Sequence, residues 1–81
     1  MIARPETPKA ETIFGIEIKG DTIALLSPSR NDDVISLIKP MKYNWNGYRW
    51  QRTPGILAGR IEDRAVELGC KLLAAGFTTR S

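Results

Sequence analysis

The sequence predicts a small α+β domain in which two β-hairpins form an antiparallel sheet packed against two helices, in the order β-β-α-β-β-α. Apolar residues alternate on both sides of Gly20-Asp21, and a second alternating segment surrounds Asn46-Gly47. Two other stretches repeat apolar residues at the spacing of an α-helix. The 81 residues are enough for one domain, and its net charge of +3 leaves room for a polyanionic partner.

The first hairpin is expected over residues 13–27. A two-residue turn at Gly20-Asp21 pairs residues whose numbers sum to 41, so Ile16 faces Leu25. The position of the turn and the alternation of apolar residues then predict the same apolar face. This face carries Phe14, Ile16, Ile18, Ile23 and Leu25.

A short helix is expected next, capped by Ser29 or Asn31. Asp32 and Asp33 fall in its first turn, where negative charge suits the helix dipole, and a capping role explains both carboxylates. Its buried stripe consists of Val34, Leu37, Ile38 and Met41.

Asn46-Gly47 is the strongest signal for the second hairpin, because both residues accept the left-handed conformation of a type I′ turn. Facing residues then sum to 93, which pairs Trp45 with Tyr48 and Tyr43 with Trp50. Four aromatic rings would share one face. We expect Trp50 to be part of the core, whereas Trp45 and Tyr48, near the turn, could be core or exposed. The opposite, polar face carries Lys42, Asn44, Arg49 and Gln51.

A longer helix is expected over residues 60–75, with Gly76 just after its end. Its apolar stripe includes Ile61, Ala65, Leu68 and Leu72, widened by Val66, Gly69, Cys70 and Leu73. Cys70 is therefore interpreted as a small buried apolar residue. Thr78 and Thr79 resemble the start of another strand, so the chain could be the N-terminal fragment of a longer protein. Residues 1–10 are interpreted as a flexible lead-in to a single domain over residues 11–81.

Several kinds of chemistry are excluded by composition. Without histidine, the chain has no Ser-His-Asp or Cys-His nucleophile system and no histidine-ligated metal. Its one cysteine forms no metal-binding or redox pair, and its glycines match no phosphate-binding loop. We therefore expect a non-catalytic protein without cofactor or metal. No apolar run approaches the about 20 residues of a membrane span, which favours a cytoplasmic location without membrane contact.

The segment with the clearest functional pattern is the second hairpin, where basic and aromatic residues alternate. Basic side chains in such a pattern can bind the phosphates of a nucleic acid, and an exposed aromatic ring can stack on a base. The pattern predicts a DNA-binding accessory domain, although a plain solvated strand explains the polar face as well. The residues that we expect to contact nucleic acid are Lys39, Lys42, Trp45, Tyr48, Arg49, Arg52 and Arg60.

The run from residue 16 to residue 50 resembles the HARP-type accessory domain found beside SNF2-family helicase motors, including shorter versions in bacterial and phage helicases. The matching features are a strand ending in Leu26-Ser27-Pro28, the helix Asp33-Val34-Ile35-Ser36-Leu37-Ile38-Lys39 followed by Pro40, and the aromatic run Tyr43-Asn44-Trp45-Asn46-Gly47-Tyr48-Arg49-Trp50. The resemblance covers less than half of the chain.

This resemblance implies a non-catalytic domain that helps a DNA translocase to engage branched DNA or single-to-double-strand junctions. The expected partner is therefore single-stranded or branched DNA. It implies a framework role for Trp45 and Trp50, and DNA contacts by Lys39, Lys42 and Arg49. The helicase association is implied by the resemblance alone.

A protein-interaction module is the alternative, for example a small phage protein that binds a host factor or self-associates. DNA binding requires the basic residues of the second hairpin and the second helix to lie on one continuous surface. A protein partner predicts an exposed apolar patch instead. The residues that could form such a patch are Trp45, Tyr48, Ile56 and Leu57.

Overall fold

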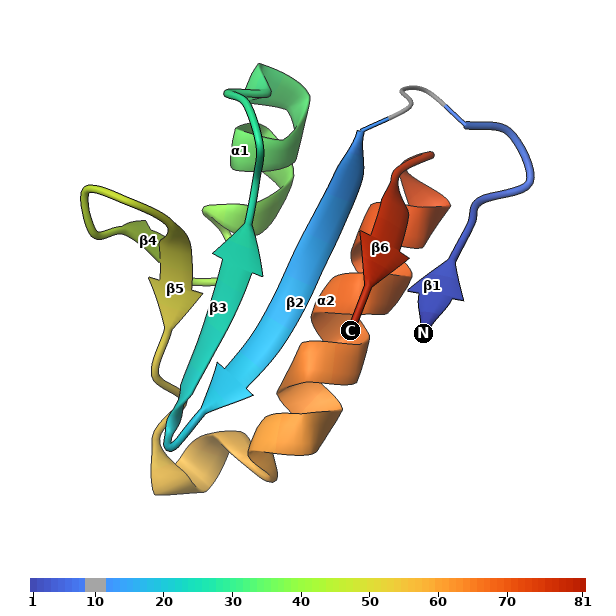
Figure 1. Cartoon of the computed structure of the whole chain (residues 1–81). Coiled ribbons are helices and arrows are strands. Elements are labelled where there is room, and N and C mark those ends of the chain that lie inside the picture. The colour runs from blue at the N-terminus through green and yellow to red at the C-terminus, as the bar shows by residue number, and fades with distance from the viewer. Residues whose placement is uncertain (9–11) are drawn as a thin grey trace.

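The computed structural model describes residues 1–8 and 12–81, which fold into a six-stranded sheet with two α-helices against one face (Figure 1). The elements are β1 (Ile2–Ala3), β2 (Ile13–Lys19), β3 (Thr22–Leu26), α1 (Asp32–Ile38), β4 (Asn44–Trp45), β5 (Trp50–Arg52), the 3₁₀ turn η1 (Ile56–Ala58), α2 (Ile61–Ala74) and β6 (Thr78–Arg80). The strand order is β1-β6-β2-β3-β5-β4.

The α+β class is confirmed, but two details of the expectation are wrong. The sheet is mixed, because β6 lies parallel to β2. The order of elements also differs from β-β-α-β-β-α, since β1 precedes the first hairpin and β6 follows α2. Both additional strands pair with each other at one side of the sheet, where β6 lies between β1 and β2.

The first hairpin has the predicted register. Ile16 pairs with Leu25 and Ile18 pairs with Ile23, with Gly20 at a φ of 62° in the turn. The predicted apolar face packs against the helices, except that Ile18, beside the turn, remains 43% exposed. The resulting core consists of Phe14, Ile16, Ile23, Leu25, Val34, Ile38, Tyr43, Leu68, Leu72 and Phe77.

The end of α2 directs the chain back into the sheet. Phe77 N donates to the Leu72 carbonyl at 2.9 Å and Gly76 N donates to the Leu73 carbonyl at 3.0 Å, the two hydrogen bonds of a Schellman cap. Gly76 has a φ of 96°, as the predicted glycine after the helix requires. Phe77 then packs edge to face on Phe14, with ring centroids 5.5 Å apart. The cap thus places β6 beside β2.

The start of α1 is also as predicted, with Asn31 as the capping residue. The Asn31 Oδ1 accepts hydrogen bonds from the backbone N–H groups of Asp33, at 3.0 Å, and Val34, at 3.2 Å. These bonds satisfy two of the N–H groups that a helix start leaves free. Asp32 and Asp33 occupy the first turn as expected.

Two other interpretations need revision. The segment 1–10, expected to be a flexible lead-in, contributes β1, in which Ile2 pairs with Arg80; Lys9 and Ala10 lie outside the described residues. The interpretation of Cys70 as buried is wrong, because its side chain is exposed. At about 100° per residue, position 70 lies far around the helix from the buried Leu68 and Leu72.

Candidate nucleic-acid interface

The second hairpin has a longer loop than predicted. Asn44 pairs with Gln51 and Trp45 with Trp50, so facing residues are shifted by two positions relative to a two-residue turn. The cause is the Asn46 side chain, whose Oδ1 accepts hydrogen bonds from the backbone N–H groups of Tyr48 and Arg49, each at 2.9 Å. Asparagine often closes a turn in this way. The loop therefore spans residues 46–49, and the predicted pairing of Trp45 with Tyr48 is wrong.

This register separates the four aromatic residues. Tyr43 is buried in the core, whereas Tyr48 is 89% exposed in the loop. Trp45 and Trp50 face each other across β4 and β5, with ring centroids 5.6 Å apart and ring planes at 55°. Trp50 packs against the core and Trp45 is 53% exposed. The two indoles thus form one partly exposed aromatic surface.

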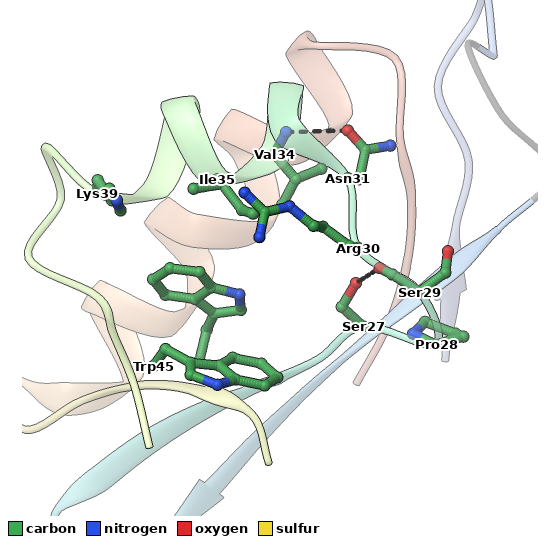
Figure 2. A pocket seen from close by; sticks show the side chains of 10 residues that line it. Ser27, Pro28, Ser29, Arg30, Asn31, Val34, Ile35, Lys39 and Trp45 are labelled. Carbon is green, nitrogen blue, oxygen red and sulfur yellow. Dashed lines mark hydrogen bonds between the residues drawn. The ribbon is translucent and has the colours of Figure 1, made fainter. Parts of the chain in front are cut away.

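That aromatic surface is one wall of a cleft of about 470 Å³, which we call the tryptophan cleft. Figure 2 shows Ile35 of α1, and Lys39 just after that helix, on its other side. The segment after β3 closes one end. The lining residues are Ser27, Pro28, Ser29, Arg30, Asn31, Val34, Ile35, Lys39, Trp45 and Trp50.

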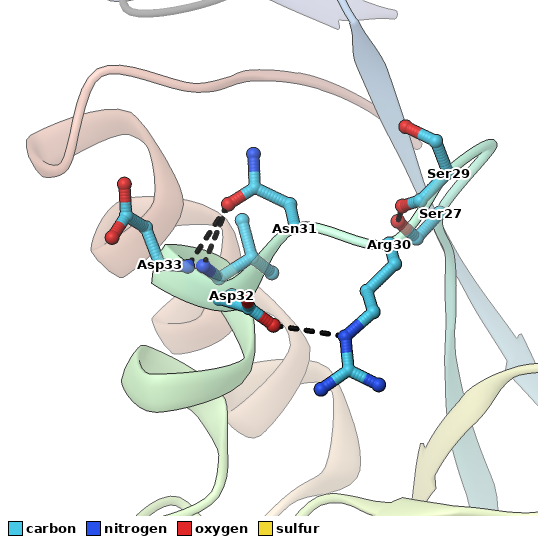
Figure 3. Close-up of polar contacts among 7 residues, drawn as sticks. Ser27, Ser29, Arg30, Asn31, Asp32 and Asp33 are labelled. Carbon is cyan, nitrogen blue, oxygen red and sulfur yellow. Dashed lines mark hydrogen bonds and ion pairs between the residues drawn. The ribbon is translucent and has the colours of Figure 1, made fainter.

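Two cations lie at the two ends of α1, Arg30 just before the helix and Lys39 just after it. The seven residues of α1 span about 10 Å, so the cations flank the cleft rather than share one point. The Arg30 Nε donates to Asp32 Oδ1 at 2.9 Å (Figure 3), but both side chains are about 80% exposed. Exposed ion pairs contribute only about 0–1 kcal/mol, so Arg30 is readily released to another anion.

The segment after β3 has its own internal bonds. Figure 3 shows the Ser27 hydroxyl donating to the Ser29 carbonyl, and Asn31 capping α1 in the next turn. These local bonds order the five residues, 27–31, that connect β3 to α1. The backbone that carries Arg30 into the cleft is therefore held at both ends.

The predicted contact residues do not lie on one surface. Lys39 and Trp45 line the tryptophan cleft, whereas Lys42 and Arg52 line a second cleft. Tyr48 projects from the hairpin loop. The other two predicted cations have carboxylate neighbours. The Arg49 Nη1 lies 4.0 Å from Glu17 Oε2, and the Arg60 Nε lies 3.5 Å from Glu62 Oε2.

The second cleft, which we call the basic cleft, has a volume of about 650 Å³. It lies along the end of β5 and the segment that leads to η1. Its lining residues are Lys42, Asn44, Gln51, Arg52, Thr53, Pro54, Gly55, Leu57 and Ala58. The two clefts share no lining residue.

The buried Tyr43, which lines neither cleft, carries a hydroxyl group that has no hydrogen-bond partner among the described residues. The pKa of Tyr43 is raised to about 12. Burial is the largest cause and raises the pKa, the positive charge of Arg52 lowers it, and the negative charge of Glu67 raises it. Tyr43 is therefore neutral at physiological pH, and its ring serves the core.

Sequence reasoning missed Arg30 and the lining role of Trp50. Arg30 follows the strand break at Ser27-Pro28-Ser29 and lies outside the second hairpin, to which the basic pattern drew attention. The available signal was the position of Arg30 directly before the capping residue Asn31, because this position places its positive charge at the start of the helix. Lys39, at the other end, was predicted.

Comparison with models of known families found no match, and no curated protein or solved structure matches the chain. Within residues 1–8 and 12–81, no helix is long and apolar enough to cross a membrane. In the same part of the chain, no three side chains of the types Cys, Asp and Glu gather as metal ligands would.

Proposed function

We propose that the chain is a non-catalytic module that binds an unpaired strand of DNA in the tryptophan cleft. The observation that carries this proposal is the arrangement of Trp45, 53% exposed and backed by Trp50, between the cations Arg30 and Lys39. Proteins that bind single strands combine aromatic stacking platforms with a positively charged path for the backbone. The resemblance to HARP-type domains favours an accessory role beside a helicase motor.

An unpaired strand fits this cleft better than a duplex does. The indole of Trp45 offers a flat face, and a base can stack on it only when that base has left its own stack. Base–aromatic stacking is worth about 1–3 kcal/mol for each base. The about 10 Å between the ends of α1 corresponds to roughly three stacked nucleotides at about 3.4 Å each. We therefore expect a short site with little sequence preference.

Phosphate contacts in this proposal belong to Arg30 and Lys39. Each neutralised phosphate makes the affinity fall as the salt concentration rises, with a slope of about −0.7 per contact for single strands. Two cations predict a shallow slope. The Arg30–Asp32 ion pair opposes binding only weakly, since it is exposed to solvent.

The test is fluorescence anisotropy with labelled oligothymidine, duplex DNA and forked DNA at low and high salt. The chain has two tryptophans, and both line the cleft, so quenching of tryptophan fluorescence reports on the cleft itself. We expect salt-sensitive binding to the single strand with quenching, and weaker binding to the duplex.

Matched variants locate the site. Trp45→Leu should weaken binding about tenfold, whereas Tyr48→Leu, an aromatic residue outside the cleft lining, should not. Lys39→Gln should lower the salt slope by about one contact, and Lys19→Gln, on the far end of β2, should leave it unchanged. Absence of single-strand binding at low salt, or equal effects of Trp45→Leu and Tyr48→Leu, contradicts the proposal.

A further inference from the structure

The basic cleft and the 3₁₀ turn beside it form a second surface that the proposed function does not use. We propose that this surface docks an acidic segment of a protein partner, in which an apolar side chain packs on Ile56 and Leu57 while carboxylates pair with Lys42 and Arg52. This inference goes beyond the binding of an unpaired strand, and it stands on different residues.

Ile56 and Leu57 are the starting point, because they are 98% and 102% exposed. Single exposed apolar residues are ordinary on protein surfaces. Two adjacent aliphatic side chains with almost no protein contact are less ordinary, since removing apolar surface from water is the main favourable term in protein association. A partner that covers both gains this free energy.

The turn that presents the two side chains is held in place. Ala58 N donates to the Gly55 carbonyl at 3.0 Å, and Gly59 has a φ of 86°, which allows the chain to leave the turn. From α2, the Arg64 Nη1 donates to the Ala58 carbonyl at 2.9 Å. The exposed pair is therefore a fixed feature of the surface, and a partner need not order it.

The charge of the neighbouring cleft indicates the chemistry of the partner. Lys42 and Arg52 line it, and its nine lining residues include no Asp or Glu. The ion pairs formed among the described residues all lie elsewhere. Lys42 and Arg52 are thus open to carboxylates from outside. Leu57 belongs to the same lining, so the apolar and the cationic contacts form one site.

A protein segment fits this combination better than a nucleic acid does. The cations alone would suit phosphates, but Ile56 and Leu57 have no ring on which a base could stack. Protein interfaces commonly surround a buried apolar anchor with a polar rim. An acidic segment with one or two large apolar residues meets both parts of the surface.

The two surfaces can be occupied at the same time. Their linings share no residue. Figure 1 shows η1 and the β4–β5 loop at opposite ends of β5. A protein partner at the basic cleft would therefore leave the tryptophan cleft accessible.

The test is selection from a phage-displayed library of random dodecapeptides on the immobilised full chain, followed by anisotropy with the enriched peptides in labelled form. We expect enriched sequences that combine Asp or Glu with Leu, Ile or Phe. Leu57→Ser and Ile56→Ser should each weaken peptide binding at least about tenfold. Arg52→Gln should weaken it and reduce its salt dependence.

Val66→Ser is the matched control, because Val66 is an exposed apolar residue, 63% accessible, on α2 outside the basic cleft. It should leave peptide binding unchanged, and circular dichroism should confirm that every variant is folded. No enrichment, enrichment of peptides without acidic residues, or equal binding by Leu57→Ser and Val66→Ser would overturn the proposal. Loss of oligothymidine binding in Ile56→Ser and Leu57→Ser would also overturn it and assign the surface to nucleic acid.

Discussion

Trp45 and Trp50 lie directly opposite each other on neighbouring strands, with ring centroids 5.6 Å apart, yet only Trp50 packs against the core. Cross-strand aromatic pairs of this kind stabilise a hairpin by about 0.2–1 kcal/mol. The two adjacent rings therefore have different roles. Trp50 attaches the short hairpin to the domain, and Trp45 presents a ring to solvent.

This division predicts unequal effects on stability. Trp50→Ala removes a ring that packs on the core and should lower the free energy of unfolding by about 3 kcal/mol. Trp45→Ala removes a ring that is 53% exposed and should cost about 1 kcal/mol, mostly the lost ring contact. Urea denaturation followed by far-ultraviolet circular dichroism measures both. Equal losses would show that Trp45 is also a structural residue.

Asn46 should control the geometry of the hairpin loop. Its Oδ1 accepts hydrogen bonds from the N–H groups of Tyr48 and Arg49, and Asn46→Ala leaves these two groups without that partner. We expect a loss of about 1 kcal/mol, with Asn46→Asp retaining most of the stability because its carboxylate accepts the same bonds. Hydrogen exchange of the Tyr48 and Arg49 amides gives a local measure. Unchanged protection in Asn46→Ala would contradict the role of the side chain.

The first hairpin and this one show what the sequence could and could not predict. In the first, alternation on both strands and the turn at Gly20 support the same register, so Ile16 faces Leu25 as expected. In the second, Asn-Gly favours a two-residue turn, but Asn46 uses its side chain to close a wider loop. A competition between two local turns cannot be decided from residue types alone.

Pairings between segments that are distant in the sequence were harder to predict than either hairpin. β6 lies parallel to β2 with Phe14 beside Thr79, and nothing in the sequence near either residue indicates this partner. The cap at Gly76 predicted where α2 ends but not which strand the chain would join. The candidate site also depends on contacts between segments that are distant in the sequence. Arg30 and Trp45 line one cleft only because α1 packs on the sheet.

Replacing Lys42 with glycine should stabilise the domain. Its φ of 71° is the only positive value at a non-glycine position among the described residues. Tyr43 N donates to the Ile38 carbonyl at 3.3 Å and Lys42 N to the Lys39 carbonyl at 2.9 Å, so Lys42 occupies the Schellman position that usually holds glycine. The left-handed conformation costs a side-chain-bearing residue about 1–2 kcal/mol.

Lys42→Gly removes this cost but gives the unfolded chain more freedom, so we expect a net gain of about 0.5–1 kcal/mol. The equivalent position after α2 provides the opposite control. Gly76 has a φ of 96°, and Gly76→Ala should destabilise the domain by about 1–2 kcal/mol. Thermal and urea unfolding of both variants test the pair. A loss of stability in Lys42→Gly would mean that the lysine side chain makes a stabilising contact that outweighs the backbone strain.

Tyr43 should make the domain sensitive to alkaline pH. Burial raises the pKa of this phenol from 10.0 to about 12, so the folded state favours the neutral form more strongly than the unfolded state does. The associated stability is fully present below about pH 10 and is lost as the pH rises towards 12. Its size is on the order of 2–3 kcal/mol.

The control for this effect is Tyr43→Phe. Within residues 1–8 and 12–81 the hydroxyl has no hydrogen-bond partner, so its removal should leave stability at neutral pH unchanged or raise it by up to about 1 kcal/mol. The two proteins differ at residue 43 alone, so the difference between their denaturation midpoints isolates Tyr43. That difference should be constant from about pH 7 to pH 9 and should grow in favour of Tyr43→Phe above about pH 10. Parallel curves for the two proteins up to pH 11 would show that the phenol ionises without cost in the folded state, and hence that water reaches the hydroxyl.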